Sequence, residues 1–229
     1  MKKTLILAAA LISIFNFQFP ISTPLHAQDY HQQYVSWGFT AGPNISSYIM
    51  KVDPLLRDTL IADSVLNSLP STGLSLSLFF DYHITDRWAL QFNGQVALEQ
   101  ALLRYADHHS HMLTFGADFG LSALYRWRWG AGHAYLSLGP YCYFVLYSAA
   151  TEGINLYRRQ IYIDPDSDKS RFAMSDIHAG LDLTLGYEFT NHWIVQLENQ
   201  FGVTDILNLK TYGTYVYPYR ITVGVGCRF

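Results

Sequence analysis

The chain has 229 residues and a formal net charge of −3 at pH 7, and charged residues make up only 14% of it. A net charge so close to neutral gives no sign of a nucleic-acid-binding surface or an acidic tail. Aromatic residues reach 16%, and so little charge in a chain of this size indicates that something other than charge meets part of its surface.

The first segment has the three parts of a secretory signal peptide. Lys2 and Lys3 form a positive start, residues 4–17 are apolar, and residues 20–27 are turn-prone and end on the small Ala27. We therefore predict a signal peptide over residues 1–27 and a mature β-barrel domain over residues 28–229. An uncleaved anchor helix is the alternative, but the apolar run is shorter than the roughly 20 residues that a spanning helix needs.

Eight later segments alternate apolar and polar residues with a period of two, which is typical of strands with one apolar and one polar face. The pattern is clearest in the second segment, and the eighth runs to the final residue, Phe229. In chain order the predicted strands cover residues 35–42, 74–84, 88–99, 113–126, 134–146, 177–189, 193–204 and 219–229.

Short and longer connections alternate between these strands. Short connections at one end and longer ones at the other are typical of outer-membrane barrels, which have an even number of strands. The sequence thus predicts an all-β fold, an eight-stranded antiparallel up-and-down transmembrane β-barrel with both termini in the periplasm. The short connections are residues 85–87, 127–133 and 190–192, and the others are residues 45–71, 104–110, 149–175 and 206–218.

The composition of the polar face separates a membrane barrel from a soluble one. A soluble eight-stranded barrel or sandwich also alternates, with its apolar residues inside. Here the lysines after the signal peptide, Lys51, Lys169 and Lys210, all fall in predicted loops. The polar face of the strands is instead rich in Ser, Thr, Gly, Asn and Gln, which suits a narrow lumen filled by side chains. We therefore assign the apolar face to lipid and the polar face to the lumen.

Aromatic residues gather where the predicted strands meet the short connections. Trp88, Tyr125, Trp127, Trp193 and Phe229 have the positions expected of an aromatic girdle at one membrane interface. Tyrosines near the longer connections are candidates for the other interface, namely Tyr48, Tyr105, Tyr147, Tyr217 and Tyr219.

The two cysteines, Cys142 and Cys227, fall on the apolar face of the fifth and eighth predicted strands. We interpret them as small hydrophobic residues. A disulfide is the alternative, but these strands are not neighbours in a simple meander, and Cα atoms more than about 7 Å apart cannot be bridged.

Charged residues recur on the inward face where the even-numbered strands end. Asp81, His83, Arg126, Glu188 and Arg228 all lie near the short-connection end of their strands. Because these strands end on the same side, we expect the five side chains at similar depth. Charges in a confined lumen need partners, so we predict a mixed-sign network that seals the periplasmic mouth.

Four short motifs carry a family resemblance. Residues 37–46, 138–143, 201–206 and 223–229 are similar to the first, fifth, penultimate and closing strands of the PorT-type family of outer-membrane β-barrel proteins from Gram-negative bacteria. The resemblance implies an integral outer-membrane protein inserted by the barrel-assembly machinery, which reads a terminal aromatic residue. It also implies a link to type IX secretion, which the member that names the family serves.

Two groups of residues offer other chemistry. His178, with Ser175 and Asp176 close in sequence, contains a base, a nucleophile and an orienting group for hydrolysis, although a lumen histidine in a polar network is the alternative. A predicted outer loop and its flank carry His108, His109 and His111, which are potential transition-metal ligands or a solvated polar stretch. We predict no catalytic, cofactor or metal site.

These features predict a non-enzymatic protein that acts through its extracellular loops, in envelope structure, partner binding or as a secretion accessory. The expected partners are outer-membrane lipid, the barrel-assembly machinery and a protein bound at the outer loops, with no nucleic acid. A lipid-modifying enzyme, with lipid-A or phospholipid acyl chemistry, and a small pore are the alternatives.

Overall fold

The computed structural model describes residues 35–52, 67–105, 108–151, 153–157, 160–164, 177–206 and 214–229. The predicted signal peptide lies outside these residues. In the part of the chain that is described, no helix is long and apolar enough to span a membrane.

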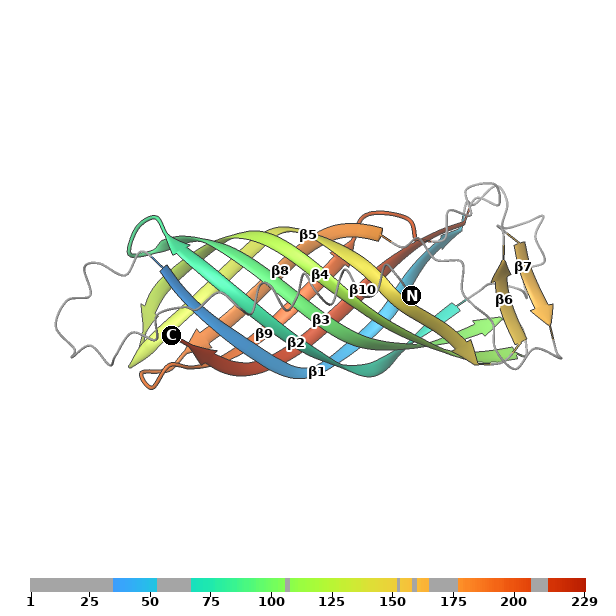
Figure 1. The fold of residues 1–229 in the computed structure, drawn as a ribbon, viewed down its shortest axis with the longest axis horizontal. Coiled ribbons are helices and arrows are strands. Elements are labelled where there is room, and N and C mark those ends of the chain that lie inside the picture. Colours follow the sequence, from blue (N-terminus) through green and yellow to red (C-terminus); the bar gives the residue numbers. More distant parts are fainter. Residues whose placement is uncertain are drawn as a thin grey trace, which may run out of the picture. The chain divides into compact units, whose positions relative to one another are not determined.

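Eight strands form a closed barrel in the order β1-β10-β9-β8-β5-β4-β3-β2, and every neighbouring pair is antiparallel (Figure 1). Strands adjacent in the barrel are successive along the chain, so the predicted eight-stranded up-and-down barrel is confirmed. The barrel strands are β1 (Val35–Val52), β2 (Asn67–His83), β3 (Trp88–Tyr105), β4 (His108–Trp129), β5 (Gly132–Thr151), β8 (Ile177–Glu188), β9 (Trp193–Gly202) and β10 (Thr214–Arg228).

The first and last strands close the barrel. Backbone hydrogen bonds join the Trp37 amide to the Phe229 carbonyl at 3.1 Å and the Phe229 amide to the Trp37 carbonyl at 2.7 Å. The register continues from Gly38 opposite Arg228 to Val52 opposite Thr214. Closure of this seam satisfies backbone groups that lipid could not satisfy.

Several strands extend beyond their predicted ends. β1 continues to Val52, β2 begins at Asn67 and β4 begins at His108, so the predicted loops over residues 45–71 and 104–110 were too long. In these extensions the apolar alternation is weak, and a register shift follows Pro70. Backbone pairing continues there without a lipid-facing apolar pattern. The strands predicted from periodicity alone were therefore too short.

The segment after β5 forms a separate two-stranded hairpin, in which β6 (Gly153–Tyr157) pairs with β7 (Gln160–Asp164). Residues 149–175 were predicted as one of the longer connections, and the part of it from residue 165 to residue 175 lies outside the described residues.

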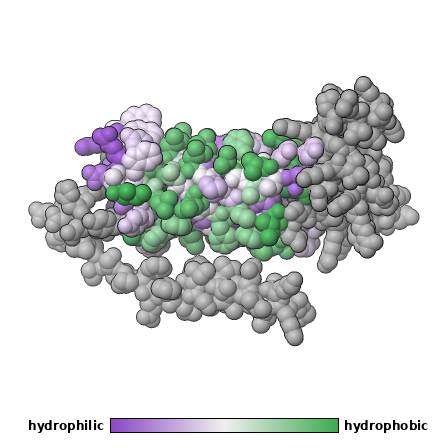
Figure 2. Space-filling view, turned by 90° about the horizontal axis from the view of Figure 1, so that it is seen from above, coloured by the Kyte–Doolittle hydropathy of each residue, from purple (hydrophilic) through white to green (hydrophobic). Residues whose placement is uncertain are grey.

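Alternate side chains of the strands face outward and are apolar. On β2 the outward residues Leu74, Leu76 and Leu78 are exposed to 63%, 49% and 46%, whereas their neighbours Ser75 and Ser77 are buried. Figure 2 shows hydrophobic residues over much of the visible barrel surface, with hydrophilic residues gathered toward one end. An apolar surface of this extent needs an apolar environment.

The interior is filled where large rings lie over glycines of the next strand. A side-chain carbon added to Gly116 would collide with the ring of Tyr143, and one added to Gly186 would collide with the ring of Tyr135. Both tyrosines are buried. Tyr48 is buried as well, so its predicted place at the outer interface was wrong, because β1 continues past residue 42 with its even-numbered residues inside.

Three tight turns lie at one end of the barrel, together with Phe229. They connect β2 to β3, β4 to β5 and β8 to β9. In the first, the Thr85 hydroxyl accepts a hydrogen bond from the Trp88 amide at 3.0 Å. In the second and third, Gly130 and His192 adopt φ values of 61° and 66°, the left-handed conformation that a reversal this short requires.

Candidate functional site

The lumen contains two charge networks at different depths. The first lies at the turn end and joins the predicted residues; we call it the turn-end network. Arg228 Nη1 donates to Glu188 Oε2 at 2.6 Å, and its Nη2 forms an ion pair with Asp81 Oδ2 at 3.0 Å. Arg126 Nη2 approaches the same Glu188 oxygen at 3.0 Å. Two guanidinium groups are thus matched by two carboxylates.

His83 joins the turn-end network through a hydroxyl. Its Nε2 lies 3.0 Å from Ser36 Oγ, which in turn donates to Asp81 Oδ2 at 3.4 Å. The other Asp81 oxygen accepts from Gln91 Nε2 at 2.9 Å. All five predicted network residues therefore lie within one set of contacts.

Aromatic rings enclose the central guanidinium. The Arg228 Cζ atom lies 5.1 Å from the centre of the Phe79 ring and 5.0 Å from that of Tyr135. Because a guanidinium stacks favourably on aromatic faces, these rings hold Arg228 between its two carboxylates and fill the space around it.

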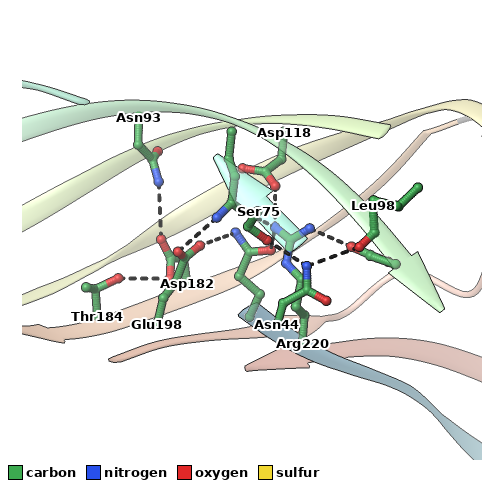
Figure 3. Close-up of polar contacts among 12 residues, drawn as sticks. Asn44, Ser75, Asn93, Leu98, Asp118, Asp182, Thr184, Glu198 and Arg220 are labelled. Atoms are coloured by element: carbon green, nitrogen blue, oxygen red, sulfur yellow. Dashed lines mark hydrogen bonds and ion pairs between the residues drawn. The ribbon is translucent and has the colours of Figure 1, made fainter. Parts of the chain in front are cut away.

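The second network lies deeper, around Arg220 of β10, and was not predicted; we call it the middle network. Arg220 Nη1 donates to Glu99 Oε1 at 2.5 Å, and Nη2 contacts Asp118, Gln95 and Gln200. These partners come from β3, β4 and β9, so one side chain connects four strands across the lumen (Figure 3). Arg220 is almost fully buried.

Two further carboxyl groups of the middle network accept hydrogen bonds from neutral donors (Figure 3). Asp182 accepts hydrogen bonds from Asn93 Nδ2 and Thr184 Oγ1, both at 3.3 Å. Glu198 accepts at 3.1 Å and 2.8 Å from the side-chain amides of Gln95 and Gln200. The middle network therefore gathers four carboxyl groups, those of Glu99, Asp118, Asp182 and Glu198, around one guanidinium.

The alternation of the sequence already placed these acidic residues on inward faces. The alternation does not give the relative depth of these residues in the barrel. The short turns align the ends of β3, β4, β8 and β9, but no sequence feature aligns the middle of these strands. The register, with Asp118 opposite Gln95 and Thr184 opposite Glu198, supplies that depth.

The candidate hydrolytic histidine is a lumen residue. His178 is buried, and its ring stacks on Tyr143 with 4.5 Å between centroids. Ser175 and Asp176 lie outside the described residues, so the arrangement of the three is not given.

The candidate metal residues lie on a strand rather than in a loop. His108, His109 and His111 are among the first four residues of β4, and His111 is exposed. No group of three or more His, Cys, Asp or Glu residues within the described ranges has a metal-binding arrangement. Both cysteines are free, and neither is fully buried.

The predicted interface aromatics cluster at the turn end. Trp88 contacts Tyr125 with 4.8 Å between ring centroids, and Tyr125 stacks on Trp127 at 5.9 Å. Across the seam, Phe229 contacts Trp37 at 4.8 Å. Trp193 is half exposed on β9.

A closed antiparallel barrel with an apolar outer face and buried charges inside defines a membrane-spanning β-barrel protein. A family model described as "Outer membrane protein beta-barrel domain" matches residues 26–208. The chain belongs to this family of outer-membrane proteins. None of the curated proteins compared matches it.

Among solved structures the chain is similar to OprG from Pseudomonas aeruginosa, with 15% identity, a TM-score of 0.46 and coverage of 85% of this chain and 95% of OprG. It is similar to AlkL in lipid bilayers, with 15% identity, a TM-score of 0.46 and coverage of 92% and 97%. For Ail of Yersinia pestis the identity is 12%, the TM-score 0.42 and the coverage 85% and 98%.

Proposed function

We propose that this protein is a non-enzymatic outer-membrane barrel with a sealed lumen, which acts through the connections at the end opposite its tight turns. Its role lies in envelope structure, in binding a protein partner or, as in PorT-type proteins, in assisting secretion. The observation that carries the proposal is Arg220, a buried side chain that crosses the lumen and contacts three other strands. A barrel filled in this way is a rigid support for loops, and binding residues tend to lie on loops over such supports.

The asymmetry of the two ends supports the orientation. The tight turns and Phe229 share one end, which we assign to the periplasm with the amino terminus. The opposite end carries the connection between β1 and β2, residues 53–66, and the one between β5 and β8, which includes the β6–β7 hairpin. Longer connections are extracellular in barrels of this class.

Conductance tests the sealed lumen. Purified protein inserted in planar bilayers is expected to show no steady conductance, because two networks of hydrogen-bonded side chains cross the interior. A large and stable conductance from the wild-type protein would contradict the sealed lumen and favour a small pore.

Loop deletion tests the partner-binding role. Residues 53–66 and residues 153–164 are replaced in turn by short Gly-Ser linkers, and proteins cross-linked to each variant are recovered from intact outer membranes. We expect a loop variant to lose a captured protein that wild type retains. Thr190→Ala, in a turn at the other end, is the matched control. If all variants captured the same proteins, the loops would not be the binding site. If deletion of the gene left the export of cargo unchanged, the secretion role would be contradicted.

The non-enzymatic assignment is tested with lipid substrates. Wild type and His178→Ala are incubated with phospholipid and with lipid A, and acyl products are measured. We expect no product from either protein, because His178 is buried against Tyr143. Product formed by wild type and lost in His178→Ala would establish the lipid-modifying alternative.

Assembly is expected to depend on the terminal aromatic residue. Phe229 contacts Trp37 and Phe39 across the closing seam, with 4.8 Å and 6.5 Å between ring centroids. Phe229→Ser should therefore lower the amount of folded protein in the outer membrane, as measured by heat-modifiable gel mobility. Leu138→Ser, on the lipid face away from the seam, is the control.

A further inference from the structure

The charge of the middle network is not balanced. Four carboxyl groups and one guanidinium lie at this depth, and all are nearly inaccessible, with Asp118 at 0%, Asp182 at 2% and Glu198 at 3% exposure. The other buried guanidinium in the described lumen, that of Arg228, is bound to Asp81 and Glu188 at the turn end. With every carboxyl group ionised, the middle network would carry a net charge of about −3.

The single guanidinium is already shared by two of the four acids. Arg220 contacts Glu99 and Asp118, and its remaining hydrogen bonds reach the amide oxygens of Gln95 and Gln200. Asp182 and Glu198 receive hydrogen bonds from neutral amides and a hydroxyl. They lie diagonally on the adjacent strands β8 and β9, where Asp182 is opposite Gln200 and Thr184 is opposite Glu198.

Two adjacent buried carboxyl groups cannot both hold a negative charge at low cost. Burying an ionised carboxylate away from water is strongly unfavourable unless a cation neutralises it, and a buried acid generally keeps its proton instead. Asp118 is a third acid beside the pair, because Arg220 Nη2 contacts both Asp118 and Gln200, and Gln200 lies opposite Asp182 and donates to Glu198. Sharing one proton between Asp182 and Glu198 removes one of the two negative charges and so lowers the energy of the pair.

We propose that the Asp182–Glu198 pair holds one proton at neutral pH and releases it to base in alkaline solution, so that the middle of the barrel is a pH-dependent lock. The titratable groups that interact with the pair from the surrounding strands are Asp118 of β4, Tyr135 and Tyr141 of β5 and Arg220 of β10. Glu99 of β3, Tyr143 of β5 and His178 of β8 interact with Arg220. Loss of the proton leaves two adjacent carboxylates in this enclosed space and weakens the packing around Arg220.

The direction of the pH effect follows from proton counting. The folded barrel binds a proton that the unfolded chain, with its carboxylates in water, does not bind at neutral pH. Stability is therefore expected to fall as the pH rises above the range in which the unfolded carboxyl groups ionise, and to level off once the folded pair has also lost its proton.

Infrared spectroscopy and unfolding of the full chain in lipid vesicles test the proposal. Wild type at neutral pH should show the C=O stretch of a protonated carboxyl group, which disappears in alkaline buffer. The double variant Asp182→Asn with Glu198→Gln should lack this band. Its urea midpoint should stay constant between neutral and alkaline pH, while that of wild type falls. Both proteins keep every tyrosine, so tyrosine ionisation cancels in the comparison.

Control variants keep the test decisive. Glu99→Gln, whose carboxylate is bound to Arg220, should retain the infrared band, and Asp182→Asn alone serves if the double variant does not fold. Absence of the band in wild type, or equal pH dependence in wild type and the double variant, would overturn the proposal. A midpoint that depends on added sodium or calcium ions and not on pH would overturn it in favour of a bound metal cation.

Discussion

The turn-end network and the middle network use the same residue types but differ in charge balance and in access to water. Near the turns, Arg126 and Arg228 match Asp81 and Glu188, and the Arg126 side chain is 14% exposed. In the middle, Arg220 alone faces four acids, and its side chain is 4% exposed, as is that of Arg228. The two networks therefore differ in access to water only at Arg126, and their main contrast is in charge balance: loss of Arg220 removes the one guanidinium in contact with the middle acids, whereas loss of Arg228 leaves Arg126 at the turn end. The same substitution should therefore cost more at depth.

The largest expected effect is that of Arg220→Met. It leaves Glu99 and Asp118 without their cation in a buried space, and breaking a buried ion pair on one side typically costs roughly 3–5 kcal/mol. Urea unfolding in lipid vesicles, followed by tryptophan fluorescence, measures the free energy of unfolding. Arg220→Lys should recover part of the loss, because it restores the charge without the forked contacts. If Arg220→Met lost no more unfolding free energy than the turn-end variants, the middle network would not be the more sensitive of the two.

A smaller loss is expected for Arg228→Met. Arg126 remains 3.0 Å from Glu188, so one buried carboxylate, Asp81, loses its cation rather than two, and the loss should lie near the lower end of the roughly 3–5 kcal/mol typical of a broken buried ion pair. The same unfolding assay applies. Adding Asp81→Asn to this variant should restore stability, since it removes the unmatched charge. No recovery in the double variant would show that packing between Phe79 and Tyr135 dominates.

The smallest effect is expected for Arg126→Gln. Its side chain is part-exposed, and Glu188 keeps its hydrogen bond to Arg228 at 2.6 Å, so the loss should stay within about 1 kcal/mol, as for other accessible ion pairs. Raising the salt concentration should shrink the difference from wild type, because water and ions reach this end. A salt-independent loss as large as that of Arg220→Met would show that both networks are equally isolated from water.

The turn-end network could be predicted from the sequence, whereas the middle network could not. The short turns align the ends of β2, β4 and β8, and β10 ends beside them, so Asp81, Arg126, Glu188 and Arg228 could be set at one depth before any pairing was known. The middle network has no such reference. Arg220 and Glu99 come together only through the register, which is set by many backbone pairs and by the shift after Pro70.

The barrel itself was predictable because lipid imposes a strict period of two on the outer face. Where the strands extend past that apolar pattern the constraint is lost, which is why the extensions of β1, β2 and β4 were read as loops. Tyr48 was misplaced for the same reason, since an aromatic residue near a loop has the same sequence signature whether it faces lipid or the lumen.

Arg220 enters the barrel with β10, the last strand of the chain, although its acidic partners Glu99 and Asp118 stand 121 and 102 residues earlier. A slip of β10 by two residues would carry Arg220 about 7 Å along the strand, away from its partners. Only the native register of β10 therefore brings this guanidinium to Glu99 and Asp118, so these two ion pairs report on correct closure of the barrel.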